Sequence, residues 1–194
     1  MRGTASYPWG EKLPTLSAER VELRALTVTD VPALFELFGD PAVTRYWSWS
    51  AFERIEQAAD LFAQIEQHFA DKSLFQWGIA DRASGRVIGT TTLHQLDWRH
   101  HRGEIGFALR QDRWRQGLAG EAVARLIDFA FGELGLHRLE ADADPRNSGS
   151  LKLLEREGFR REGLLRERYH VGGEIQDAAL LGLLRSERRR NGNG

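Results

Sequence analysis

Apolar residues alternate with polar or small residues in some segments of the chain and recur every three or four positions in others. The first pattern is typical of a half-buried β-strand and the second of an amphipathic helix. These patterns predict strands near residues 21–26, 75–79, 87–96, 104–109, 137–143, 158–170 and 178–184. They predict helices near residues 31–38, 51–71 and 118–131, and a short helix after Asn147. The order β-α-α-β-β-β-α-β-α-β-β indicates an α/β or α+β domain with a mixed sheet.

The chain has 194 residues, a length that suits one domain. Residues 1–18 contain Pro8, Gly10 and Pro14 without a clear period, and we interpret them as an N-terminal arm. Residues 19–184 form the predicted domain. Residues 185–194 are polar and include a short basic run, which favours a solvated tail over an RNA contact.

Composition narrows the classes of function. The chain is 41% hydrophobic and 28% charged, close to an average soluble globular protein. It contains no cysteine, which excludes a disulfide framework, a thiol nucleophile and a thiolate metal site and fits a cytoplasmic location. The formal net charge is −1, so no general attraction to nucleic acid or to a membrane surface is expected.

Other classes of partner have no sequence signal. No apolar run approaches the roughly 18 residues that cross a bilayer, and the first residues lack the apolar segment of a secretory signal. We therefore predict no membrane partner. His94, His100, His101 and His170 lack metal-ligand spacing with carboxylates, so no metal is predicted. A homodimer is left open.

The segment from Gly117 to Gly120 separates the 104–109 strand from an apolar helix. A helix start has unpaired backbone N–H groups and a partial positive charge, and small residues let a phosphate approach it. A plain tight turn is the alternative. There is no Gly-Lys-Ser/Thr ending of a P-loop and no three-glycine dinucleotide fingerprint.

The segment Trp114–Ala122, with sequence WRQGLAGEA, resembles the acetyl-CoA pyrophosphate motif of the GNAT N-acetyltransferase superfamily. Its form is similar to that of the ribosomal-protein N-terminal (alanine/serine) acetyltransferase branch. Other segments resemble that branch in order and spacing: Arg20–Arg24 with Asp30, Asp40–Val43, Glu104–Phe107, Asn147–Leu154 with Glu157–Phe159, and Gly173 with Asp177. The resemblance covers about residues 19–184.

The resemblance implies a bulged mixed β-sheet that is splayed between its fourth and fifth strands and flanked by helices. The pantetheine arm of acetyl-CoA would lie in the gap, where Gly106 marks a bulge or a close backbone approach. The cofactor-binding residues that it implies are Phe107, Ala108 and Leu109 for the pantetheine arm, Arg115, Gln116, Gly117, Leu118, Ala119 and Gly120 for the pyrophosphate, and Asn147. Arg113 and Arg115 would add positive charge at the rim.

Acetyl transfer needs a base for the amine and a proton for the leaving thiolate. Glu104 is the best candidate base, acting through water, with an ordinary solvated carboxylate as the alternative; Glu162 is a weaker candidate. Many superfamily members have a tyrosine general acid where this chain has Leu154. Ser150 is the nearest hydroxyl, and it either protonates the thiolate or caps the helix. Tyr169 is a further candidate.

Tyr46, Trp47 and Trp49 fall where relatives form one wall of the acceptor cleft, although an aromatic cluster packed over the sheet explains them equally well. The predicted function is transfer of an acetyl group from acetyl-CoA to an amine, by direct attack in a ternary complex. The resemblance favours a protein N-terminal α-amine as the acceptor. Acetylation of a small amine or drug, a non-catalytic acyl-CoA sensor and an RNA-associated module are the alternatives.

Overall fold

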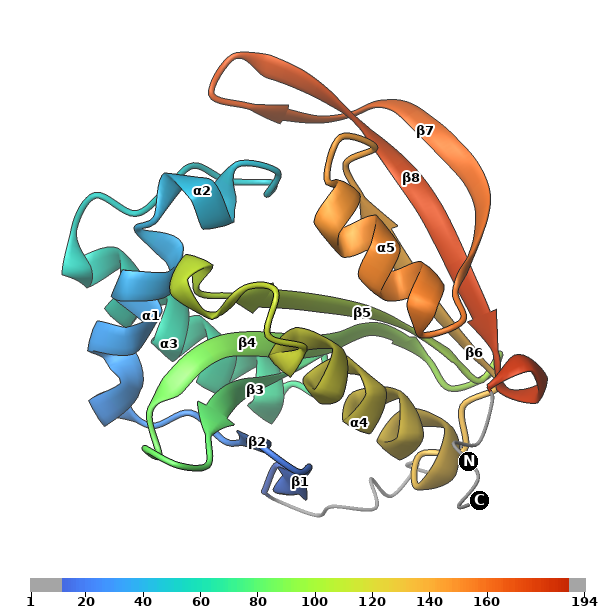
Figure 1. The fold of residues 1–194 in the computed structure, drawn as a ribbon, viewed down its shortest axis with the longest axis horizontal. Coiled ribbons are helices and arrows are strands. Elements are labelled where there is room, and N and C mark those ends of the chain that lie inside the picture. The colour runs from blue at the N-terminus through green and yellow to red at the C-terminus, as the bar shows by residue number, and fades with distance from the viewer. Residues whose placement is uncertain (1–11, 189–194) are drawn as a thin grey trace.

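The structure, a computed structural model, describes residues 12–188. It is an eight-stranded sheet with helices on both faces (Figure 1). The strands are β1 (Leu16–Ser17), β2 (Val21–Arg24), β3 (Leu74–Asp81), β4 (Val87–Asp97), β5 (Arg102–Leu109), β6 (Arg138–Ala143), β7 (Arg160–Val171) and β8 (Glu174–Leu184). The α-helices are α1 (Val31–Phe38), α2 (Pro41–Thr44), α3 (Ile55–Ala70), α4 (Leu118–Gly132) and α5 (Ser148–Arg156), with short 3-10 turns at Val28–Asp30, Gln111–Arg113 and Arg185–Glu187.

The sheet has the order β1-β2-β3-β4-β5-β6-β8-β7. Only β5 and β6 are parallel, and their pairing is limited to Arg102–Glu104 against Arg138–Glu140. Both strands continue past this ladder, β5 to Leu109 and β6 to Ala143, and they diverge (Figure 1). Counted from β2, these are the fourth and fifth strands, so the predicted mixed sheet with a splay at this place is confirmed.

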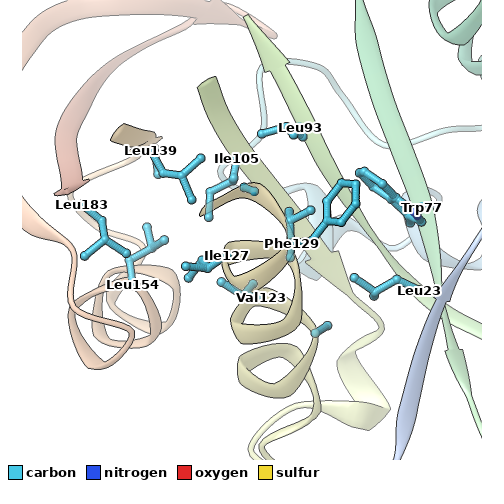
Figure 2. Packing of buried hydrophobic residues seen from close by; sticks show 14 of the residues in the cluster. Leu23, Trp77, Leu93, Ile105, Val123, Ile127, Phe129, Leu139, Leu154 and Leu183 are labelled. Atoms are coloured by element: carbon cyan, nitrogen blue, oxygen red, sulfur yellow. The ribbon is translucent and has the colours of Figure 1, made fainter. Parts of the chain in front are cut away.

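Each face of the sheet has its own core. Ile105 and Leu139 point to the face that α4 and α5 cover, where they pack with Ile127 and Leu154 (Figure 2). Ala108 points to the opposite face and packs with residues of α1 and α3. Successive residues of a strand alternate between faces, so Glu104, one residue before Ile105, lies on the α1 side.

Several predicted bounds differ from the observed ones. β1 lies within the predicted N-terminal arm, where Leu16 is buried and pairs with Leu23 of β2. Trp77 Nε1 also donates a hydrogen bond to the carbonyl oxygen of Pro14 at 2.8 Å. The helix predicted over residues 51–71 begins only at Ile55. Because these contacts join the β1 region to residues further along the chain, they produce no periodic pattern in the sequence around β1.

The bulges do not lie where Gly106 suggested. Gly106 pairs in regular register with Thr92, and a Cβ at Gly106 would lie 2.7 Å from Thr92 Oγ1, so Gly106 marks a close approach and not a bulge. The register of β4 and β5 shifts between His94 and Asp97 instead. Further shifts lie between Ile79 and Ala80 in β3 and, in β7, between Arg161 and Gly163 and between Leu165 and Tyr169.

Within residues 12–188, no helix is both long enough and apolar enough to cross a membrane.

Candidate active site

The turn between β5 and α4 has the backbone of an anion-binding site. Arg115, whose side chain is exposed, has φ of +61° and Gly117 has φ of +81°, with only Gln116 between them. Backbone N–H groups around such left-handed residues converge into a concavity that binds anions. The N–H groups of residues 118–120 open α4 and have no acceptor within the helix. Together these groups can hold a phosphate.

Three side chains, from the turn itself, from α4 and from the residue before β2, hold this turn in place. Trp114 Nε1 donates to the carbonyl oxygen of Leu109 at 2.7 Å, which ties the turn to the end of β5. Arg20 Nη1 donates to the carbonyl oxygen of Gln116 at 2.9 Å. The Glu121 carboxylate accepts from Arg20 Nε at 2.9 Å and from the Arg20 backbone N–H. The turn is therefore fixed before any ligand arrives.

The positive charge at the turn matches the prediction only in part. Arg115 lies in the turn with an exposed side chain, whereas Arg113, also expected at the rim, forms an ion pair with Asp81 at 3.2 Å. Arg20 and Arg156 lie at the turn as well: a Cβ at Gly117 would be 3.2 Å from Arg20 Nη2, and a Cβ at Gly120 would collide with the Arg156 guanidinium. Arg156 closes α5, far along the chain, so no local sequence signal places it here.

The splayed part of β5 contains Phe107, Ala108 and Leu109. Beyond Glu104, β5 has no partner on the β6 side among residues 12–188, so alternate backbone groups face the gap. The Leu109 carbonyl oxygen already accepts from Trp114. The side chains of Ala108 and Leu109 are buried in the two cores on opposite faces, which leaves the backbone as the part of these residues that a ligand in the gap can contact.

The start of α5 lies beside the same gap. Asn147 is the N-cap, and its Oδ1 accepts a hydrogen bond from the Ser150 backbone N–H at 3.1 Å. Within the described part of the chain, no acceptor takes a hydrogen bond from the Asn147 NH2 group, so this group can donate to a ligand. Because Asn147 caps the helix, the capping role considered for Ser150 is wrong. Its role as proton donor stays a prediction.

Glu104 stands where β5 and β6 separate. It is the last residue of the short parallel ladder, opposite Glu140. Gln95 Nε2 donates to its Oε2 at 3.1 Å, and His94 Nε2 lies 3.6 Å from its Oε1. Burial raises the pKa of Glu104 to about 7, and the negative charges of Asp142 and Glu140 add to the effect. A carboxylate with this pKa can accept a proton near neutral pH.

Glu162, the weaker candidate base, has another role. Its carboxylate forms a two-contact ion pair with Arg138, one contact being 3.0 Å. This hydrogen-bonded pairing lowers the pKa of Glu162. A carboxylate stabilised in its ionised form is a poor proton acceptor, so this ion pair, which joins β7 to β6, disfavours Glu162 as the base.

The three candidate acceptor aromatics do not form one surface. Trp47 and Trp49 pack edge-to-face, with ring centroids 4.6 Å apart, and both contact Phe38 of α1. Tyr46 contacts two guanidinium groups instead, with its ring centroid 5.3 Å from Arg45 Cζ and 5.6 Å from Arg146 Cζ. Trp47 packs against the core on the α1 side, as the packed-cluster alternative expects, and Trp49 is exposed, whereas Tyr46 reaches toward the β6–α5 loop. Its contact with an acceptor stays a prediction.

Within residues 12–188, no three His, Asp or Glu side chains gather so as to hold a metal ion.

A model of the family described as "Acetyltransferase (GNAT) domain" matches residues 20–160. The chain belongs to the GNAT acetyltransferase family. It is therefore an acetyl-CoA-dependent acetyltransferase, with acetyl-CoA as its donor.

Individual GNAT relatives extend over most of the chain. The sequence is 35% identical to "Uncharacterized N-acetyltransferase p20" of Bacillus licheniformis, over 90% of this chain and 98% of the relative. It is 29% identical to "Putative ribosomal N-acetyltransferase YdaF" of Bacillus subtilis, over 87% and 93%. The fold matches a Vibrio cholerae spermidine N-acetyltransferase in complex with CoA and spermine, with TM-score 0.76, 24% identity and coverage of 87% and 97%.

Replacing Gly117 with alanine tests the turn. The positive φ and the nearby Arg20 guanidinium make a Cβ unfavourable, and a shifted turn misaligns the N–H groups. We expect Kd for acetyl-CoA to rise about tenfold, roughly 1.4 kcal/mol, by isothermal titration calorimetry. Gly85→Ala is the matched control, because Gly85 also has positive φ but lies in the β3–β4 turn. Equal affinities for the two variants would remove the turn from the donor site.

Replacing Glu104 with glutamine tests the base. Since Glu104 accepts a proton only when it is ionised, kcat/KM of the wild type should rise with pH through about 7. Glu104→Gln should lower kcat/KM by about 10²–10⁴-fold and abolish that rise. Glu162→Gln is the matched control and should keep both rate and profile. A wild-type pH profile retained by Glu104→Gln would assign the base elsewhere.

Proposed function

We propose that this GNAT enzyme transfers an acetyl group from acetyl-CoA to a protein N-terminal α-amine, by direct attack in a ternary complex. The observation that carries the proposal is Glu104, which stands at the branch of the gap with a pKa of about 7. The match to a relative named as a putative ribosomal N-acetyltransferase agrees with this acceptor.

The proton affinity of the acceptor decides what a base of this strength can do. An α-ammonium with pKa near 7.8 gives its proton to Glu104 at a cost of about 1 kcal/mol. A lysine-like ammonium, with pKa near 10.4, would cost about 4.6 kcal/mol. The second transfer is roughly 400 times less favourable as an equilibrium. Glu104 therefore suits an α-amine better than a long-chain alkylamine.

The donor residues follow from the same geometry. The turn from Arg115 to Gly120 holds the pyrophosphate, the free backbone of Phe107 and Ala108 contacts the pantetheine arm, and the Asn147 NH2 group donates to the donor molecule. Ser150, on the α5 side of the sheet, gives the leaving thiolate its proton, while Glu104 works from the α1 side. The thioester thus lies in the gap with its two proton-transfer groups on opposite faces.

A small polyamine is the second candidate acceptor. Two carboxylates, Glu104 and Asp142, interact electrostatically at the gap, and such a pair attracts a substrate with several ammonium groups. The fold neighbour crystallised with CoA and spermine is a spermidine N-acetyltransferase. A cytoplasmic location, which the cysteine-free composition favours, suits either acceptor.

An acceptor panel separates these functions. We would measure CoA release with acetyl-CoA and one of three acceptors: a lysine-free peptide with a free α-amine, an N-blocked peptide containing lysine, or spermidine. Mass spectrometry would locate the acetyl group. We expect kcat/KM for the free α-amine to exceed the other two by at least about tenfold, given the proton cost above. Preference for spermidine would establish the second candidate, and CoA binding without release for any amine would indicate a sensor.

A further inference from the structure

Two irregular strand segments flank the gap, and each directs a side chain onto a carboxylate. In β4, the register shift between His94 and Asp97 includes Gln95, whose φ is +48°. A non-glycine residue with this φ carries strain that is retained mainly at functional sites. The bulged Gln95 donates to Glu104 Oε2 at 3.1 Å, so this bulge serves the proposed base.

The β7 bulge serves a second carboxylate. Leu165 pairs with Ala178 and Tyr169 with Gln176, so Arg166, Glu167 and Arg168 stand opposite Asp177 alone. Glu167 has φ of +56°, and its N–H donates to Asp177 Oδ1 at 2.8 Å, which stabilises the bulge.

Tyr169 is the first residue after this bulge to regain the register. Its hydroxyl donates to Asp142 Oδ2 at 2.5 Å. Burial and this hydrogen bond raise the pKa of Tyr169 to about 12, so Tyr169 keeps its proton and is a poor general acid for the thiolate. Its contribution is to orient the Asp142 carboxylate, and the bulge places it to do so.

Asp142 lies on the gap-lining part of β6, two residues beyond Glu140 and on the same face. Glu140 is paired with two cations: Arg102 at 2.9 Å and Arg138 at 2.8 Å. By contrast, within residues 12–188 no lysine or arginine forms an ion pair with Asp142. Of the two β6 carboxylates, Asp142 is therefore the one whose charge is not matched by a cation among the described residues.

The charged surroundings of Glu104 come from four strands. His94 of β4 has its pKa lowered by burial, so it is mostly neutral near pH 7. Arg102 of β5 and Arg168 of β7 attract the ionised form of Glu104, and Glu140 and Asp142 of β6 oppose it. A cation placed beside Asp142 would offset the effect of Glu140 and Asp142 on the ionisation of Glu104.

We propose that Asp142, oriented by Tyr169, binds the ammonium group of the acceptor and presents it to Glu104 across the gap. This inference rests on the proposed acetyl transfer and adds a recognition site for the primary ammonium to it. The ammonium gives one proton to Glu104, and the neutral nitrogen attacks the thioester carbonyl. The C–N bond forms and the C–S bond breaks. After the attack, the acceptor nitrogen loses a second proton, and this proton restores the Ser150 hydroxyl that has protonated the thiolate.

The test is steady-state kinetics of Asp142→Asn with the best acceptor of the panel. Loss of the carboxylate should raise KM for the amine about tenfold at pH 7, because the acceptor arrives as ammonium, and leave KM for acetyl-CoA within twofold. The pH at which kcat/KM rises should move down by about half a unit or more, since Asp142 no longer opposes ionisation of Glu104. Tyr169→Phe, which keeps the ring but loses the hydroxyl, should also raise KM for the amine, by about threefold.

Glu140→Gln is the matched control, because Glu140 lies two residues before Asp142 on the same face of β6. Its carboxylate is already paired with Arg102 and Arg138, so we expect KM for the amine to rise less than twofold. An unchanged amine KM in both Asp142→Asn and Tyr169→Phe overturns the inference while leaving acetyl transfer standing. Equal effects from Asp142 and Glu140 also overturn it, as they would reflect general charge. Absence of transfer by the wild type contradicts the proposed function itself.

Discussion

The early end of the parallel ladder between β5 and β6 is the constraint on which the rest of the site depends. After Glu104 and Glu140 the strands part, although each continues for several residues. Backbone groups that a regular sheet would pair internally then remain for a ligand in the gap. α4 and α5 cover the gap on one face, which brings the turn before α4 and Asn147 to its edge. The proposed donor site is thus a consequence of interrupted strand pairing.

The same interruption explains the unusual chemistry of Glu104. A carboxyl group at the branch point is partly withdrawn from water by both strands, and its nearest neighbours on β6 are further carboxylates. In a stable structural role such a group would be paired, as Glu140 is with Arg102 and Glu162 with Arg138. Glu104 has Gln95 and a mostly neutral His94 instead. Its ionisation is disfavoured, which is what a base that works near neutral pH requires.

Local patterns in the sequence predicted the fold well, because periodicity reports which side of each element is buried. They also located the turn at Gly117, since helix starts and small residues are local features. They failed where a partner lies far along the chain: Arg113 pairs with Asp81, and Arg156 reaches Gly120 from α5. The role proposed for Asp142 could not be predicted for the same reason. Its contact with Tyr169 depends on a bulge set by strand pairing, which leaves no signal around either residue.

The central claim is that acetyl-CoA enters the gap between β5 and β6 with its pyrophosphate on the turn before α4. Amide hydrogen exchange measured with and without acetyl-CoA tests this claim most directly. The account predicts slower exchange in residues 105–109 and 117–120 on binding, with the β3–β4 turn at residues 82–86 unchanged as an internal reference. Binding that leaves both of the first two segments unprotected would contradict the account.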